Sequence, residues 1–157
     1  MSTFRIQQVD ANLLRTEARR LTALLKGLVP AAEVLEVGST AVPGVIGKGD
    51  IDLLVRVPAE AFAATRDRLD GALRRNAEQL STDRYQGYHL DSPVDAAVQL
   101  TITGCEHDDF EPFLEALRAD PALVNAYNAM KLRWNGQPMA AYRTAKSQFI
   151  EQVLASR

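Results

Sequence analysis

Residues 50–57 form the pattern Asp-Ile-Asp-Leu-Leu-Val-Arg-Val, in which two aspartates separated by one residue precede an apolar run. The branched and apolar side chains predict a β-strand. Because side chains alternate across a strand, we expect Asp50 and Asp52 to project from one face, while Ile51 and Leu53 point from the other face toward the core. Two carboxylates on one face repel unless a cation lies between them, and hard oxygen ligands suit Mg²⁺ or Mn²⁺. The pattern therefore predicts a metal site with Asp50 and Asp52 as ligands.

A second short strand, Glu33 to Val37, precedes this one and ends at Gly38-Ser39. Gly38 allows the backbone to approach an anion without a Cβ in the way. The Ser39 hydroxyl and the N–H groups of the turn that continues through Thr40 can donate to phosphate oxygens. Since protein-bound Mg²⁺ usually completes its shell with water and substrate phosphates, we expect this turn to bind the phosphates of a nucleotide beside the metal. Lys48, in the Gly- and Pro-bearing loop between the strands, either reaches a triphosphate or is a solvated loop lysine.

The rest of the chain supplies helices around a small sheet. Apolar residues at three- and four-residue spacing predict amphipathic helices, and alternating runs bounded by turn residues predict strands. The expected elements are helices at 10–28 and 58–80, strands at 85–90 and 95–103 that form a hairpin, and three helices after residue 108, with breaks at 120–121 and 136–138. We expect one domain over residues 1–157, because this length suits a single core. The fold class is α+β, with a small mixed β-sheet and flanking helices.

The stretch Gly38-Ser-Thr-Ala-Val-Pro-Gly44, followed by Lys48 and Asp52, resembles the signature of the GrpB-like family, which belongs to the polymerase-beta-like nucleotidyltransferases. The resemblance continues through the C-terminal third, at residues 117–121, Tyr127, Lys131, Tyr142, Lys146 and 149–150. It implies a nucleotidyltransferase-like fold and a pair of metal ions held by Asp50, Asp52 and a third carboxylate. The implied reaction moves a nucleoside monophosphate from a triphosphate to an acceptor hydroxyl.

Two departures from the family pattern concern the activity. Many members carry an apolar residue where Asp50 stands, so this chain looks closer to an active transferase. Members usually carry a His-x-His pair on the later strand, where this chain has Gln99 and Thr101. We predict Asp95 as the third carboxylate, because it shares strand parity with Gln99. Asp91, the other acid nearby, lies in the turn.

Tyr127 and Lys131 are four residues apart on a predicted helix and therefore share one face. That face either closes over the phosphates, with Lys131 as a ligand, or is a plain surface pair. His89 and His107 lack a second histidine at metal-ligand spacing, so we interpret them as packing or capping residues.

Composition restricts the partners. A net charge of −2 and a pI near 5.7 do not favour broad binding to nucleic acid, which needs clustered Lys and Arg. The single cysteine, Cys105, cannot form an internal disulfide, and the chain has no run of eighteen apolar residues that could cross a bilayer. We therefore expect a cytoplasmic protein that binds a small-molecule nucleotide and does not enter a membrane.

The leading hypothesis is a metal-dependent nucleotidyltransferase. The alternatives are a catalytically silent nucleotide-binding or protein-interaction module of the same fold, and a structural partner domain without a ligand. The acceptor, the choice of nucleotide and the oligomeric state stay open at this point.

Overall fold

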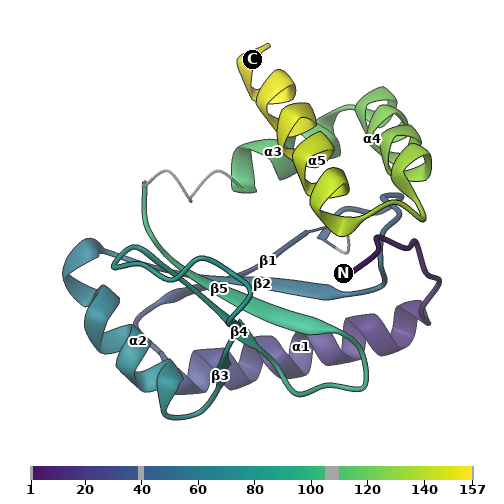
Figure 1. Cartoon of the computed structure of the whole chain (residues 1–157). Coiled ribbons are helices and arrows are strands. Elements are labelled where there is room, and N and C mark those ends of the chain that lie inside the picture. Colours follow the sequence, from purple (N-terminus) through teal and green to yellow (C-terminus); the bar gives the residue numbers. More distant parts are fainter. Residues whose placement is uncertain (1, 39–40, 105–109, 157) are drawn as a thin grey trace.

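A computed structural model describes residues 2–38, 41–104 and 110–156 (Figure 1). Its centre is a five-stranded sheet in the order β1-β2-β5-β4-β3. The strands are β1 (Glu33–Val37), β2 (Ile51–Val57), β3 (Arg74–Arg75), β4 (Tyr85–His89) and β5 (Ala96–Ile102). β2 and β5 run parallel, and every other neighbouring pair is antiparallel. The sheet is therefore mixed, and the predicted α+β class is confirmed.

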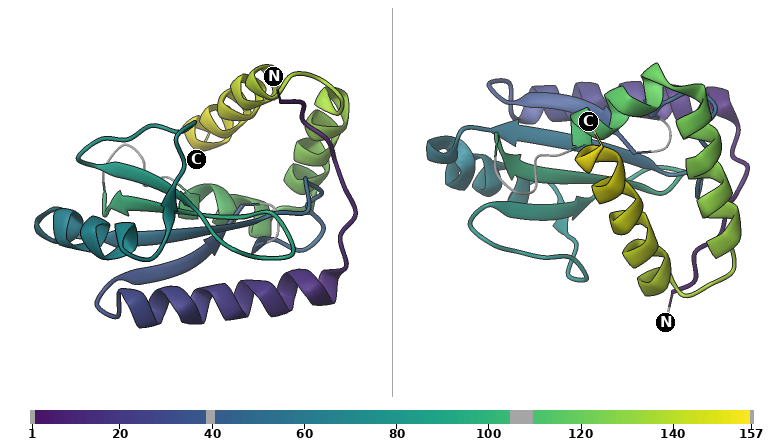
Figure 2. Two further views of the ribbon diagram at one scale, coloured as in Figure 1. Left: turned by 60° about the horizontal axis from the view of Figure 1, so that its bottom comes forward. Right: turned by 90° about the horizontal axis from the view of Figure 1, so that it is seen from above.

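Helices cover both faces of the sheet (Figures 1 and 2). α1 (Ala11–Leu28) and α2 (Phe62–Asp70), with the short 3-10 turn η2 (Ala59–Ala61) before α2, pack on one face. α3 (Phe110–Ala119), α4 (Pro121–Trp134) and α5 (Met139–Ala155) lie on the other face. Within the described residues, no helix combines the length and the apolar character needed to cross a membrane.

The boundaries of α1 and α4 follow from capping residues. The Asp10 side chain accepts hydrogen bonds from the backbone N–H groups of Asn12 and Leu13, so it satisfies donors that lack a partner within the helix. Asp120 does the same for Ala122 at the start of α4, and Pro121 occupies the first turn, where its missing N–H removes no helical bond. These local signals explain why both helices begin where the sequence predicts.

The predicted helix over 58–80 is wrong in its C-terminal half. α2 ends at Asp70, with Gly71 as its C-cap, and β3 follows as a short edge strand on β4. Arg75 turns back and forms an ion pair with Asp70 at 2.8 Å. The arginines of this segment fit a polar helix face in the sequence, but tertiary pairing with β4 overrides that local pattern. The predicted hairpin of β4 and β5 and the three C-terminal helices are confirmed. Cys105 and His107 lie outside the described residues.

Side chains of β2 point alternately into the core on one face of the sheet and toward the C-terminal helices on the other face. Ile51 and Leu53 are fully buried in the cluster that includes α1 and α2, as predicted, and Val55 is buried with them. Leu54 points the other way and packs in a second cluster with α3 and α4. Asp52 has the parity of Leu54, so β2 directs its carboxylate between the sheet and the C-terminal helices.

The N-terminal segment, residues 2–9, connects two parts of the chain that are distant in sequence. The N–H of Phe4 donates to the carbonyl of Gln137 at 2.9 Å, and the N–H of Gln7 donates to the carbonyl of Gly47 at 3.0 Å. The Phe4 ring stacks on Tyr142, with ring centroids 3.6 Å apart. This segment therefore ties the turn between α4 and α5 to the loop that leads into β2.

Candidate functional site

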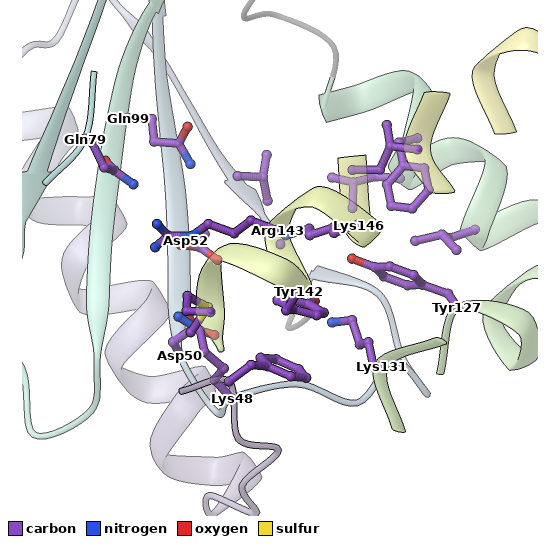
Figure 3. Close-up of a pocket in the computed structure, with 18 residues that line it drawn as sticks. Lys48, Asp50, Asp52, Gln79, Gln99, Tyr127, Lys131, Tyr142, Arg143 and Lys146 are labelled. Atoms are coloured by element: carbon purple, nitrogen blue, oxygen red, sulfur yellow. The ribbon is translucent and has the colours of Figure 1, made fainter. Parts of the chain in front are cut away.

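A cavity of about 190 Å³ lies between the start of β2 and the helices α4 and α5 (Figure 3). Gly38, Lys48, Asp50 and Asp52 line it from the sheet side. The helices contribute aromatic and basic side chains: Tyr127 and Lys131 from α4, and Tyr142, Arg143 and Lys146 from α5. Phe4, Phe113, Gln79 and Gln99 also line it. The cavity thus brings together residues from nearly the whole length of the chain.

The two aspartates stand at the start of β2, directly beside Gly38. Val37 pairs with Asp52 across the antiparallel strands, and Gly38, the next residue, lies beside the Asp52 carboxylate. Gly38 has φ +82°, and a Cβ at this position would lie 2.6 Å from Oδ2 of Asp52. Glycine is therefore required here for both its conformation and its lack of a side chain. The predicted juxtaposition of Gly38 with the carboxylate pair is present.

The loop before β2 is held by contacts with α4 and with the N-terminal segment. Asn128 of α4 accepts a hydrogen bond from the N–H of Ile46 at 3.0 Å and donates to the carbonyl of Gly44 at 2.8 Å. A Cβ at Gly49, which has φ +74°, would collide with the Val9 side chain. These contacts fix the approach of the chain to Asp50.

Lys48 lies in this loop, and its Nζ is 3.3 Å from Oδ2 of Asp50. The Lys48 side chain lines the cavity, and its contact with a triphosphate stays a prediction.

The Asp52 carboxylate is held in an environment that disfavours its negative charge. Burial, together with the charge of Asp50, raises the pKa of Asp52 to about 6. Lys146, Lys48 and Lys131 oppose this shift. Desolvation and a like charge act in the same direction on a carboxyl group, so the positively charged side chains only partly compensate.

Lys131 is a buried lysine and not part of a surface pair, which excludes one of the two sequence interpretations. Its side chain is 3% exposed, and its Nζ donates to the carbonyl of Ile46 at 2.8 Å. The same Nζ lies 4.5 Å from the centroid of the Tyr127 ring. Burial, with the nearby charge of Lys146, lowers the pKa of Lys131 to about 7, against the opposing charges of Asp50 and Asp52.

The predicted third carboxylate does not join this cluster. Asp95 precedes β5, its side chain is exposed, and its backbone carbonyl accepts a hydrogen bond from the N–H of Ile51 at 2.8 Å. It is not among the residues that line the cavity. Level with Asp52 on β5 is Ala97, which has no ligand atom. Among the residues that the structure describes, no three acidic, histidine or cysteine side chains group at metal-binding distance.

Other site predictions have mixed outcomes. Ser39 and Thr40 lie outside the described residues. Gln99, which shares strand parity with Asp52, faces the cavity as expected. Phe4, Gln79 and Arg143 line it without having been singled out in the sequence. Arg143 lies one turn before Lys146 on the same helix, and this spacing is the one local signal that could have identified it.

Comparison with known proteins supports the fold. The profile of the GrpB protein family matches residues 6–156. A UPF0157 protein of Vibrio cholerae serotype O1 is 32% identical over 144 residues, which make up 91% of this chain and 74% of that protein. The crystal structure of the conserved protein GrpB from Enterococcus faecalis matches with a TM-score of 0.63 and 17% identity, over 94% of this chain and 96% of that chain.

A structure of Cid1, which has RNA terminal uridylyl transferase activity, matches with a TM-score of 0.52 and 15% identity. That match covers 81% of this chain and 40% of Cid1. The chain therefore has a nucleotidyltransferase-like fold.

Proposed function

The chain belongs to the GrpB family, and from this premise we propose that its cavity binds a nucleoside triphosphate with Mg²⁺ or Mn²⁺ and transfers the nucleotidyl group to an acceptor hydroxyl. The observation that carries the proposal is the placement of Asp50 and Asp52 beside Gly38, facing the buried Lys131 across one cavity. Carboxylates for a metal, a glycine that leaves space beside them and a lysine held in place are parts that phosphoryl transfer uses.

The donor set fits a divalent cation. Asp50 and Asp52 offer hard carboxylate oxygens, and two protein carboxylates are sufficient for Mg²⁺, which usually keeps several waters and binds substrate phosphates. The raised pKa of Asp52 shows that its charge lacks full compensation in the protein alone. Lys48 now pairs with Asp50, and a metal on that carboxylate would release the ammonium group for a phosphate.

The cationic side chains of the cavity fit the phosphates. Lys48, Lys131 and Lys146 supply three basic groups around the two carboxylates. Lys131 is held in place by the Ile46 carbonyl, so it loses little side-chain freedom when it contacts a ligand. This excess of basic groups suits a polyanion such as a triphosphate.

In the proposed reaction, the acceptor oxygen forms a bond to the α-phosphorus as the bond from that phosphorus to the bridging oxygen breaks. The electron pair of the broken bond leaves with pyrophosphate, and the hydroxyl proton passes to water. Bound Mg²⁺ would polarise the phosphoryl oxygens and offset the charge that develops on the leaving group. The lysines orient the phosphates, and the rings of Tyr127 and Tyr142 exclude water from one wall of the cavity.

Calorimetric titration of the four ribonucleoside triphosphates with Mg²⁺, followed by an assay for released pyrophosphate, tests this function. Asp52→Asn is expected to abolish metal-dependent triphosphate binding while the far-ultraviolet spectrum stays native. Asp67→Asn makes the same chemical change at an exposed position of α2, away from the cavity, and should leave binding intact. Unchanged binding by the Asp52 variant would reject the assignment.

A catalytically silent nucleotide-binding module is the second candidate, and the absence of Asp95 from the cavity lining favours it. Such a protein would be stabilised by triphosphates and metal without releasing pyrophosphate with any acceptor. Binding in an Asp95→Ala variant would then equal that of the wild type.

A further inference from the structure

The cavity continues past Asp52 on the side away from Lys48. Because β2 and β5 run parallel and Leu54 pairs with Gln99, Gln99 lies two residues further along the strands than Asp52. Lys48 and Asp50 precede Asp52 along the chain, so they lie at the opposite side, as Figure 3 shows. The cavity therefore has two chemically separate sides, with Asp52 between them.

The side beyond Asp52 is built around hydrogen-bond donors. The buried hydroxyl of Tyr85 donates to Oε1 of Gln99 at 2.9 Å and lies 3.4 Å from Oε1 of Gln79. Burial, assisted by the charge of Asp52, raises the pKa of Tyr85 to about 12, so the hydroxyl keeps its proton at neutral pH. With both amide oxygens turned toward this hydroxyl, the two NH₂ groups are left as the donors of Gln79 and Gln99.

Gly87 makes this arrangement possible. It pairs with Gln99 across the antiparallel strands β4 and β5, and a Cβ at this position would collide with Oε1 of Gln79. The missing side chain leaves the space in which the Gln79 amide lies over the sheet. Its position therefore depends on a specific residue of the neighbouring strand and is not that of a free surface side chain.

Arg143 of α5 is the third residue on this side of the cavity. Arg143 is an exposed residue that also lines the cavity, and its charge lies near enough to Tyr85 to oppose the rise in the pKa of that hydroxyl. In the part of the chain that the structure describes, no carboxylate forms an ion pair with it. A guanidinium in this setting can donate two parallel hydrogen bonds to a phosphate or carboxylate.

We propose that Gln79, Gln99 and Arg143 form an acceptor subsite that binds a phosphate or carboxylate group of a small hydroxyl-bearing molecule. This inference rests on the proposed function and names the class of its acceptor. The anionic group would contact Arg143 and the two amides, which leaves the hydroxyl next to Asp52, where the bond to the α-phosphorus forms. A small acceptor fits better than a polynucleotide, because the chain as a whole is acidic and lacks the cationic excess that a long phosphate backbone favours.

Glycerol 3-phosphate, glycerate and glycerol serve as probes, since they share a hydroxyl and differ in the anionic group. Each is titrated into the full chain with Mg²⁺ and a non-hydrolysable ATP analogue present, so that the triphosphate side is already filled. We expect glycerol 3-phosphate or glycerate to bind and glycerol to give no signal at millimolar concentration. Whichever of the two anions binds distinguishes a phosphate group from a carboxylate group as the natural ligand.

Arg143→Ala should weaken binding of the anionic probe about tenfold or more, the usual effect of removing a charge-assisted hydrogen bond. Arg143→Lys should restore part of it. Arg133→Ala, an exposed change on α4 away from the cavity, should have no effect, and the affinity for the ATP analogue should be nearly the same in all variants.

Several results would overturn the subsite. These are equal binding of glycerol and the anionic probes, no binding of either anion, and undiminished anion binding in Arg143→Ala. Binding of a short oligonucleotide in place of the small probes would also overturn it and would indicate a polynucleotide acceptor. If the subsite fails while the ATP analogue still binds in an Asp52-dependent way, the proposed function stands. If the analogue itself does not bind, the proposed function fails first.

Discussion

Replacing Asp52 with asparagine should stabilise the metal-free protein above neutral pH, even though it removes a ligand of the proposed metal site. The reason is that the cavity disfavours the charge of this side chain. Burial and the neighbouring Asp50 raise its pKa from an ordinary value of 3.8 to about 6. An asparagine of the same shape avoids that unfavourable charge.

The magnitude follows from linkage between protonation and folding. Between pH 3.8 and about pH 6 the folded state binds more protons at Asp52 than the unfolded state, so stability falls as the pH rises through this window. The rise of the pKa from 3.8 to about 6, at about 1.4 kcal/mol per pH unit, means that the charged Asp52 lowers the free energy of unfolding by about 3 kcal/mol. This destabilisation is fully present above pH 6 and absent below about pH 4. For a domain of this size, that difference corresponds to a rise in Tm of roughly 6–12 °C for Asp52→Asn at pH 8.

Thermal or urea denaturation in EDTA at pH 4 and at pH 8 measures the effect. Asp67→Asn, on the exposed side of α2, is the matched control and should change stability little at either pH. The same gain at both pH values, or a loss of stability at pH 8, would refute the argument that burial and Asp50 make the charge unfavourable. With Mg²⁺ and a triphosphate added, the order should reverse, because only the wild type gains binding energy.

Three further substitutions test the parts around the carboxylates. Gly38→Ala should lower the free energy of unfolding by about 1–2 kcal/mol through the backbone conformation alone, and it should also weaken triphosphate binding. Gly136 also has a positive φ but has open space for a Cβ, so Gly136→Ala should affect stability only. Asn128→Ala removes two hydrogen bonds to the loop before β2 and should cost about 2 kcal/mol in urea denaturation, and Asn125→Ala, exposed on the same helix, should cost much less. Lys131→Met should be more stable than the wild type at neutral pH, because the buried lysine binds its proton less readily in the folded state than in the unfolded state. The wild type gains stability as the pH rises from about 7 to 10.5, so this difference should shrink over that range. A pH-independent difference would contradict the argument.

The elements that the sequence predicts well are those with strong local signals. The strand of residues 50–57 shows its alternation clearly, and Ile51 and Leu53 are buried on the expected face. α1 has both an apolar stripe and a capping aspartate. The segment after α2 has no such signal, because Arg74 and Arg75 form β3 only through pairing with β4, a contact that no local pattern encodes.

The site divides in the same way. Gly38 directly follows β1, Asp50 directly precedes β2 and Asp52 lies on β2, so the turn signal and strand parity together place them side by side. Phe4 enters the cavity through hydrogen bonds to the turn between α4 and α5, more than a hundred residues away, and an amphipathic pattern cannot reveal this. Asp95 has the parity for a third carboxylate, but it precedes the paired part of β5, so parity does not bring it into the cavity.

The opposite pKa shifts of Asp52 and Lys131 lead to a last prediction, that metal and triphosphate bind cooperatively. Each side chain is held where burial disfavours its charge, so the protein alone stabilises neither the carboxylate nor the ammonium fully. A divalent cation compensates Asp52 and a phosphate compensates Lys131, while the two ligands also attract each other, so binding of one should strengthen binding of the other. Calorimetry with ATP in Mg²⁺ and in EDTA measures this coupling, and Asp52→Asn separates it from the pairing of Mg²⁺ with ATP in solution. The affinity of the wild type should depend on Mg²⁺ much more than that of the variant, and an equal dependence in both proteins would show that the carboxylate takes no part in binding the metal.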